Sequence, residues 1–168
     1  MSARKIKSLP ELCLALRTDR RSGKTIGLAN GCFDLLHVGH IRYLEAARSH
    51  CDTLVVAINS DRSMRALKGP RRSVVPESER LEIIAALEAV AYVVLFDEPD
   101  VRGVLVALRP HKHIKGTDYS IGTVPERDLV EAIGGEVVIA GDQKSHSSTD
   151  VVQTIIERYT RAADPVDQ

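Results

Sequence analysis

Tryptophan is absent from this chain, and aromatic residues as a group make up only 4% of it. Single-stranded nucleic acids are bound largely by stacking of bases on aromatic side chains, so this composition disfavours such a function. Lysine plus arginine and aspartate plus glutamate number 23 each, which gives a formal net charge of +0. Without a net positive field, the chain has no general attraction for nucleic acid or an anionic membrane. Neither partner is expected, and any anion site must be local.

Cysteine is also scarce, because Cys13, Cys32 and Cys51 are the only three in 168 residues. Three dispersed cysteines do not make a disulfide framework and are typical of free thiols in a reducing compartment. No apolar run is long enough for a membrane span, and the N-terminal segment lacks the apolar core of a signal peptide. These features predict a cytoplasmic protein.

Short apolar segments alternate with amphipathic ones along the chain. Strands are predicted at 25–30, 52–60, 91–96, 111–116 and 136–141, and helices at 8–23, 38–50, 75–90, 99–109, 124–135 and 147–161. This alternation predicts a Rossmann-like α/β fold, with a doubly wound, five-stranded parallel sheet and helices on both faces. We expect one domain over residues 1–160 and a flexible C-terminal tail over 161–168. The ligand of such a sheet binds beyond the carboxyl ends of its strands.

The segment LANGCFDLLHVGHIRYLEAAR (28–48) lies at the first predicted turn from strand to helix. Gly31 and Gly39 allow the backbone to approach a ligand closely, and the N-terminus of a helix attracts phosphate. His37 and His40 flank Gly39 and can donate hydrogen bonds to phosphoryl oxygens. Phosphate binding therefore explains more of this segment than the alternatives, which are a zinc site, an acid/base pair and the packing of core histidines.

A second stretch, SGKT (22–25), is similar to the end of a P-loop, but its context is wrong. Thr18 occupies the position where the first glycine of a P-loop is needed. A helix is predicted before the stretch and a strand after it, which reverses the order that a P-loop requires. The stretch is interpreted as a polar turn, so segment 28–48 remains the main candidate phosphate site.

The histidine segment resembles the signature of the cytidylyltransferase-like nucleotidyltransferases, in which an H-x-G-H motif binds the phosphates of the nucleotide. Further segments resemble that family in the same order, covering about residues 6–158. They are NSD (59–61), LKGPRR (67–72), ESERLEIIAALEAVAYVV (77–94), IKGTDY (114–119) and SSTDVV (147–152). We expect LKGPRR to be a basic loop and Ser148 or Thr149 to cap the last helix. As an ordered set these motifs are far more specific than H-x-G-H alone.

Within the family, the motifs most resemble the adenylyltransferase domains that activate D-glycero-β-D-manno-heptose 1-phosphate, which are often fused to a sugar kinase. The resemblance implies that the sugar phosphate attacks the α-phosphorus of ATP and yields an ADP-sugar and pyrophosphate. It also implies that Mg²⁺ arrives with ATP, without a dedicated metal site built from protein ligands. A separate sugar kinase is expected to act before this enzyme.

The resemblance implies a role for residues in each motif. His37, His40 and Lys68 are expected to be catalytic, with His40 stabilising the α-phosphoryl group in the transition state. The residues expected to contact the nucleotide are Asn30, Gly31, Cys32, Phe33, His37, Gly39, His40, Lys115, Gly116, Asp118, Ser148 and Thr149. The residues expected to contact the sugar phosphate are Asp34, Asn59, Asp61, Lys68, Arg72 and Arg80.

Two alternative functions stay open at this point. A glycerol-3-phosphate cytidylyltransferase that uses CTP is disfavoured, though not excluded, because no arginine precedes SST in the stretch DQKSHSSTD (142–150). A non-catalytic nucleotide-binding module is the other, and the presence of the histidines, Lys68 and Arg80 argues against it. A homodimer formed by the apolar faces of the first and third predicted helices is compatible with the pattern.

Overall fold

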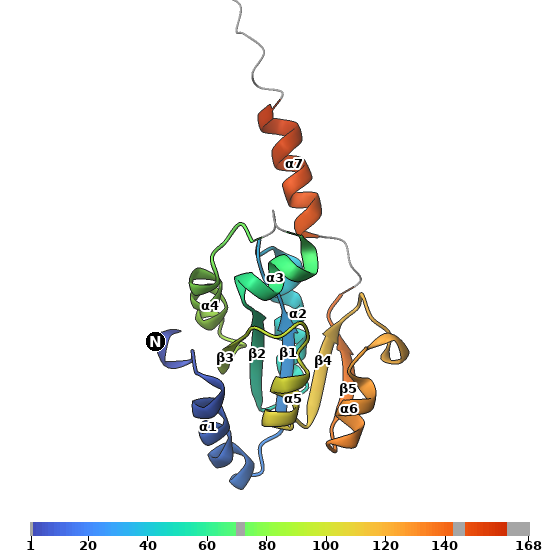
Figure 1. Ribbon diagram of the computed structural model, residues 1–168. Helices are drawn as coiled ribbons and strands as arrows, with labels where there is room; N and C mark the ends of the chain where they lie inside the picture. The colour runs from blue at the N-terminus through green and yellow to red at the C-terminus, as the bar shows by residue number, and fades with distance from the viewer. Residues whose placement is uncertain (1, 70–72, 143–146, 161–168) are drawn as a thin grey trace, which may run out of the picture.

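The computed structural model describes residues 2–69, 73–142 and 147–160. Its five strands are all parallel and form one sheet in the order β3-β2-β1-β4-β5 (Figure 1). The strands are β1 (Ile26–Gly31), β2 (Thr53–Asn59), β3 (Tyr92–Phe96), β4 (Lys112–Gly116) and β5 (Glu136–Ala140). The predicted α/β class with a five-stranded parallel sheet is therefore confirmed.

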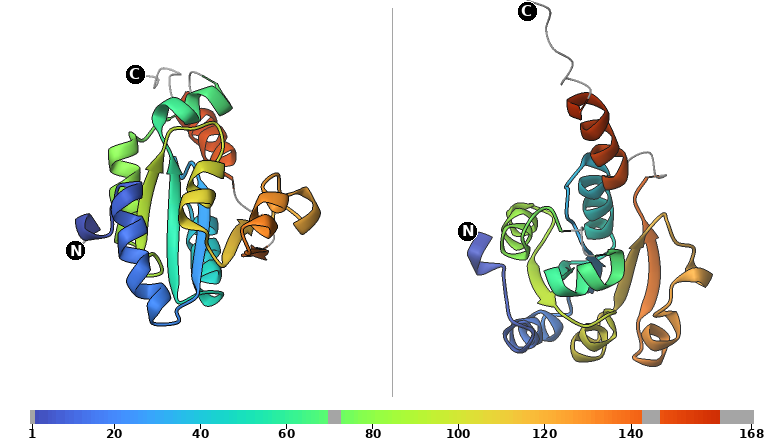
Figure 2. Two further views of the ribbon diagram at one scale, coloured as in Figure 1. Left: turned by 60° about the horizontal axis from the view of Figure 1, so that its bottom comes forward. Right: turned by 45° about the horizontal axis from the view of Figure 1, so that its top comes forward.

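Helices cover both faces of this sheet (Figure 2). Buried side chains of α1, α5 and α6 pack on one face, and those of α2 and α4 pack on the other. The described α-helices are α1 (Leu9–Arg21), α2 (Val38–Ser49), α3 (Asp61–Lys68), α4 (Glu77–Ala86), α5 (Arg102–Leu108), α6 (Arg127–Ala132) and α7 (Ser148–Thr160). None of the helices in the described part of the chain has both the length and the apolarity needed to cross a bilayer.

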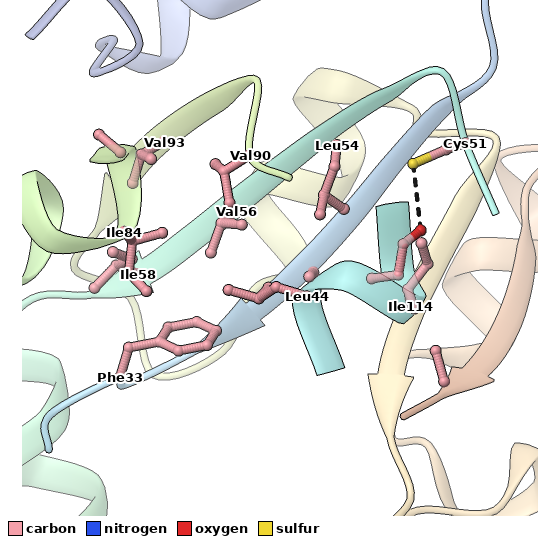
Figure 3. Packing of buried hydrophobic residues seen from close by; sticks show 14 residues of the cluster. Phe33, Leu44, Cys51, Leu54, Val56, Ile58, Ile84, Val90, Val93 and Ile114 are labelled. Atoms are coloured by element: carbon pink, nitrogen blue, oxygen red, sulfur yellow. Dashed lines mark hydrogen bonds between the residues drawn. The ribbon is translucent and has the colours of Figure 1, made fainter. Parts of the chain in front are cut away.

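The core between the sheet and helices α2 and α4 is made mainly of buried aliphatic side chains (Figure 3). Every residue of β2 is buried, as expected for a central strand of a parallel sheet that is covered on both faces. Leu44 of α2 and Ile84 of α4 meet β2 at Val56 and Ile58 in this cluster. Phe33 belongs to the same cluster, so the core also anchors the loop that follows β1.

The strand order reverses between β1 and β4. From β1 the chain adds β2 and then β3 on one side, and β4 and β5 then extend the sheet on the other side of β1. The carboxyl ends of β1 and β4 therefore form the switch point at which doubly wound sheets bind ligands. The segments after β1 and β4, which carry NGCFDLLHVGH and KGTDY, meet there.

Two sequence-based expectations about local structure are wrong. Leu67 and Lys68, expected to begin a basic loop over 67–72, are instead the last two residues of helix α3. Ser60 caps this helix by accepting a hydrogen bond from the backbone N–H of Ser63 at 3.0 Å. The cap of α7 is Ser147 instead of Ser148 or Thr149, because Ser147 and Asp150 exchange backbone-to-side-chain hydrogen bonds. The predicted tail at 161–168 lies outside the described residues.

Candidate active site

A cavity of about 780 Å³ opens at the carboxyl ends of the strands, over the switch point. Residues from five separate motifs of the sequence line this cavity. Among the predicted site residues, those in its wall are Asn30, Gly31, Cys32, Phe33, Asp34, His37, Gly39, His40, Asn59, Lys68, Lys115, Gly116, Asp118, Ser148 and Thr149. The fold thus gathers segments that are more than 100 residues apart in the chain around one space.

The loop after β1 turns tightly before it reaches α2. Phe33 has a positive φ of 49°, an uncommon conformation for a residue other than glycine. A Cβ atom on Gly31 would lie 3.1 Å from the Phe33 ring, so a larger residue would push against the buried ring. The loop is held in this shape by the burial of Phe33, which is 5% exposed. The resulting turn brings His37 to the N-cap of α2.

His37 and His40 lie side by side at the start of α2, with ring centroids 4.0 Å apart. The backbone N–H of His37 donates to Nδ1 of His40 at 3.3 Å. Since Nδ1 accepts this bond, the proton of a neutral His40 must be on Nε2. His40 therefore offers its Nε2–H as a hydrogen-bond donor beside the positive end of the α2 dipole.

The surroundings of His40 keep its imidazole neutral. Burial lowers the pKa of His40 to about 4, and the nearby His37 and Lys68 lower it in the same direction. The Phe33 ring lies beside His40, with 5.5 Å between the two ring centroids, and forms part of the apolar surroundings of the imidazole. Near neutral pH, His40 can therefore donate a hydrogen bond to a phosphoryl oxygen without carrying a charge itself.

Lys68 supplies a full positive charge to the wall of the same cavity. It is exposed, and it makes no hydrogen bond or ion pair to a residue that the structure describes. The positive charge of Lys68 is near enough to His40 to lower the pKa of that imidazole. Helix α3 thus places an ammonium group in the same cavity as the histidines, where an anionic ligand would contact both.

Arg80 and Asp61 lie behind the cavity wall and do not line the cavity. The Arg80 side chain is 0% exposed and forms an ion pair of 2.7 Å with Asp61 Oδ1. Its Nε donates to the carbonyl of Val75 at 3.0 Å, and its Nη1 donates to the carbonyl of Cys32 at 2.5 Å. The guanidinium thus binds the loop after β1 to the segment before α4, and the predicted contact with the sugar phosphate stays a prediction.

The carboxylates near Arg80 hold the same two segments together. Asp34 Oδ1 accepts hydrogen bonds from the backbone N–H groups of Val74 and Val75 at 2.9 and 2.8 Å. Burial by itself would raise the pKa of Asp61, but hydrogen bonds from Ser73 and Arg80 outweigh it and hold the pKa below its ordinary value. Asp61 is therefore ionised as the partner of Arg80. Arg72, a further predicted contact of the sugar phosphate, lies outside the described residues.

The opposite wall of the cavity is formed by β4 and the start of α7. Lys115 Nζ donates to Oδ1 of Asn30 at 3.1 Å, so the ends of β4 and β1 are bound across the switch point. Ser148 Oγ donates to the carbonyl of Leu35 at 3.2 Å and joins the start of α7 to the loop after β1. The first turn of α7, with Ser148 and Thr149 in the cavity wall, adds a second helix N-terminus to the site.

Several residues of the cavity wall were missed by sequence reasoning: Arg42, Tyr43, Asp100, Tyr119, Glu126 and Asp142. Tyr43 lies one turn after His40 on α2, and its hydroxyl donates to the carbonyl of Ile114 at 2.7 Å. Its position in the histidine segment could have marked it as a site residue. Glu126 gave no such signal, because an acid just before a helix is normally exposed at a cap. The described residues contain no group of three or more His, Cys, Asp or Glu side chains that could hold a metal ion.

Two curated proteins are similar to this chain over most of its length. The bifunctional protein HldE of Syntrophotalea carbinolica is 46% identical over 155 residues, which are 92% of this chain and 32% of that protein. The HldE of Geobacter sulfurreducens is 41% identical over 155 residues, again 92% of this chain and 32% of that protein. The chain spans about a third of the length of these curated relatives.

A solved structure is also similar to this one. It is the crystal structure of the lipopolysaccharide core biosynthesis protein from Thermoplasma volcanium GSS1, with a TM-score of 0.62 and 27% sequence identity. The similarity covers 73% of this chain and 100% of that chain. The model of the family described as cytidylyltransferase-like matches residues 28–162, which include the histidine turn, most of β1 and all of β2 to β5. The chain therefore belongs to the cytidylyltransferase-like family.

Proposed function

We propose that this protein is an adenylyltransferase that transfers AMP from ATP to a sugar 1-phosphate, with D-glycero-β-D-manno-heptose 1-phosphate as the acceptor. The likeness of its motifs to heptose 1-phosphate adenylyltransferases supports this choice of nucleotide and sugar. The similar Thermoplasma protein takes part in lipopolysaccharide core biosynthesis, which agrees with a sugar nucleotide as product.

The observation that carries the proposal is the pairing of a neutral donor with a cation across one cavity. His40 offers Nε2–H because its Nδ1 is occupied by the N–H of His37. Lys68 faces the same cavity as an ammonium group that forms no ion pair within the described residues. Donors and charges of this kind suit phosphoryl-type transfer, in which the protein mainly positions the reactants and stabilises developing charge.

The proposed reaction is an in-line displacement at the α-phosphorus of ATP. An oxygen of the sugar phosphate forms a new bond to this phosphorus, the bond from the phosphorus to the bridging oxygen breaks, and pyrophosphate leaves with the electron pair. A phosphate monoester is already largely ionised near pH 7, so no strong general base is required. His40 would donate to the α-phosphoryl oxygens, and Lys68 would neutralise charge on the acceptor phosphate or on the leaving pyrophosphate.

Magnesium enters this proposal as part of the substrate MgATP, because Mg²⁺ usually binds through phosphates and few carboxylates. The domains that its motifs resemble are often fused to a sugar kinase, so we propose that a sugar kinase acts before this reaction. A pair of copies acting as a dimer is a further proposal, which analytical ultracentrifugation would test.

A pyrophosphate-release assay tests the function directly. ATP and CTP are each combined with heptose 1-phosphate and with glycerol 3-phosphate, and the ADP-heptose product is identified by mass spectrometry. We expect release with ATP and heptose 1-phosphate to exceed the other three pairs by at least tenfold. Faster release with CTP and glycerol 3-phosphate would replace the proposal with a cytidylyltransferase, and binding of nucleotide without release in any pair would indicate a non-catalytic module.

A further inference from the structure

A buried polar cluster lies at the switch point on the face of the sheet away from α2. Leu28 of β1 pairs in register with His113 of β4, and Leu28 packs among the side chains of α1 and α5. Side chains two residues apart on a strand share one face, so Asn30 and Lys115 lie on the same face as Leu28 and His113. This cluster and the histidines of α2 therefore lie on opposite faces of the sheet, and the cavity at the strand ends is lined by both.

Asn30 is the centre of this cluster. Its Oδ1 accepts from Lys115 Nζ at 3.1 Å and lies 3.1 Å from His113 Nε2. Lysine can only donate, which identifies the atom of Asn30 as the amide oxygen and requires His113 to donate from Nε2. Burial, together with the nearby charge of Lys115, lowers the pKa of His113 to about 3, so His113 is neutral near pH 7. The amide of Asn30 and the ammonium of Lys115 are thus held in fixed positions.

Glu126, the N-cap residue of α6, completes the cluster but is poorly satisfied within it. The residue is only 6% exposed, and its Oε2 has no hydrogen-bond partner among the residues that the structure describes. Lys115 Nζ forms an ion pair with Glu126 Oε2 at 3.8 Å, which is beyond hydrogen-bond distance. A buried carboxylate without a hydrogen-bond donor is unfavourable, and such groups in native proteins normally have a partner.

The cavity brings a ligand to this carboxylate, because Glu126 and Lys115 both line it together with His40. An ionised carboxylate only accepts hydrogen bonds, so the missing partner must be a donor. A phosphate would be repelled by Glu126, and a cationic ligand would be repelled by Lys115. Neutral donors remain, and among these two adjacent hydroxyls suit a carboxylate best, because its two oxygens can each accept from one of them.

We propose that Glu126 is a specificity residue that accepts hydrogen bonds from adjacent hydroxyl groups of the bound substrate. Lys115, which Asn30 holds in position, balances the charge of the carboxylate from 3.8 Å, so that Glu126 does not repel the phosphates bound at the histidines. The inference deepens the proposed function and rests on it. The hydroxyls have two possible sources, the ribose of the nucleotide and the ring of the acceptor sugar, and the experiment separates them.

The test compares Glu126→Gln with wild type and with the control Glu131→Gln. Glu131 is an exposed acid on the same helix, paired with Arg127, and it does not line the cavity. KM and kcat are measured for ATP and for heptose 1-phosphate. Dissociation constants are measured by calorimetry for both substrates, for 2′-deoxy-ATP and 3′-deoxy-ATP, and for deoxy analogues of the sugar phosphate.

We expect Glu126→Gln to raise KM and the dissociation constant of one substrate about ten- to hundredfold, the range for hydrogen bonds to a charged group. The loss should disappear with the analogue that lacks the contacted hydroxyl, which also identifies the source. The kcat value should change less than threefold, and Glu131→Gln should match wild type.

Three results would overturn the assignment of Glu126. They are unchanged affinity for both substrates, an equal loss for hydroxylated and deoxy ligands, and a fall in kcat without a change in KM. Failure of the proposed function is a different result, because wild type itself would then release no pyrophosphate from ATP and heptose 1-phosphate. In that case the calorimetric comparison of ATP, its deoxy analogues and the sugar phosphate still decides the role of Glu126.

Discussion

His40 has two separable tasks in this structure, and two substitutions distinguish them. Its Nδ1 accepts from the backbone of His37, and its Nε2–H is the donor that we assign to the α-phosphoryl group. In His40→Asn, the side-chain oxygen can take the place of Nδ1, but no donor reaches the position of Nε2. In His40→Gln, the longer amide can place an N–H near the position of Nε2, but the acceptor for His37 is lost.

The expected magnitudes follow from these two contacts. Loss of one donor to a transition-state oxyanion costs about 10²–10³ in kcat, so His40→Asn should lose that much while remaining folded. The bond from His37 is long at 3.3 Å, so its loss in His40→Gln should cost only about 0.5–1 kcal/mol, in the lower part of the range for N-cap residues. For a domain of this size that corresponds to a fall in melting temperature of about 1–4 °C. The turnover of His40→Gln should lie well above that of His40→Asn.

The assay is pyrophosphate release at saturating substrate, with thermal unfolding followed by circular dichroism on the same preparations. His40→Ala, which lacks both groups, should show the low turnover of the Asn variant and the lower stability of the Gln variant. Near-wild-type turnover in His40→Asn would refute the donor role of Nε2. Equal turnover of the Asn and Gln variants, with both folded, would refute the separation of tasks.

Three further predictions follow from burial and charge. Arg80→Met should lower the free energy of unfolding by about 3–5 kcal/mol in urea titrations, because it leaves Asp61 without its buried partner. A variant that is as stable as wild type but has a raised KM for the sugar phosphate would instead favour a direct contact of Arg80 with that substrate. Lys68→Ala should reduce kcat/KM about tenfold or more, because the variant lacks the positive charge that faces the substrates. Its melting temperature should not change, since Lys68 is exposed, and unfolding of this variant would show that the residue is structural. The pKa of His113 is lowered from its ordinary value of 6.5 to about 3 in the folded protein, so protonation favours the unfolded chain between these two pH values. The free energy of unfolding should therefore fall as the pH drops below 6.5, by at most about 1.4 kcal/mol per pH unit, and level off near pH 3. His113→Gln should remove this part of the pH dependence, and the same slope in both proteins would contradict the assignment.

The sheet and the histidine turn could be predicted from the sequence because their signals are local. Five short apolar segments alternate with amphipathic ones, and each became a strand within one or two residues of its predicted position. The predicted residues at the carboxyl ends of β1 and β4 meet because parallel strands place those ends along one edge. Helix α3 was missed because its eight residues are mostly polar and only Ser63 and Met64 are buried. Such a short helix depends on its Ser60 cap and on tertiary packing more than on its own periodicity.

The roles of Arg80 and Glu126 depend on burial, which no local pattern specifies. Both are charged residues near the start of a helix, where exposure is the usual outcome. Both are buried in the structure, but they differ in their hydrogen-bond partners. Arg80 has three protein acceptors for its guanidinium, so its burial stabilises the loop after β1. Glu126 has a cation at 3.8 Å and no donor for Oε2 in the described part of the chain. A buried carboxylate with an incomplete set of hydrogen bonds does not stabilise the fold. We therefore attribute the burial of Glu126 to a ligand that binds in the cavity.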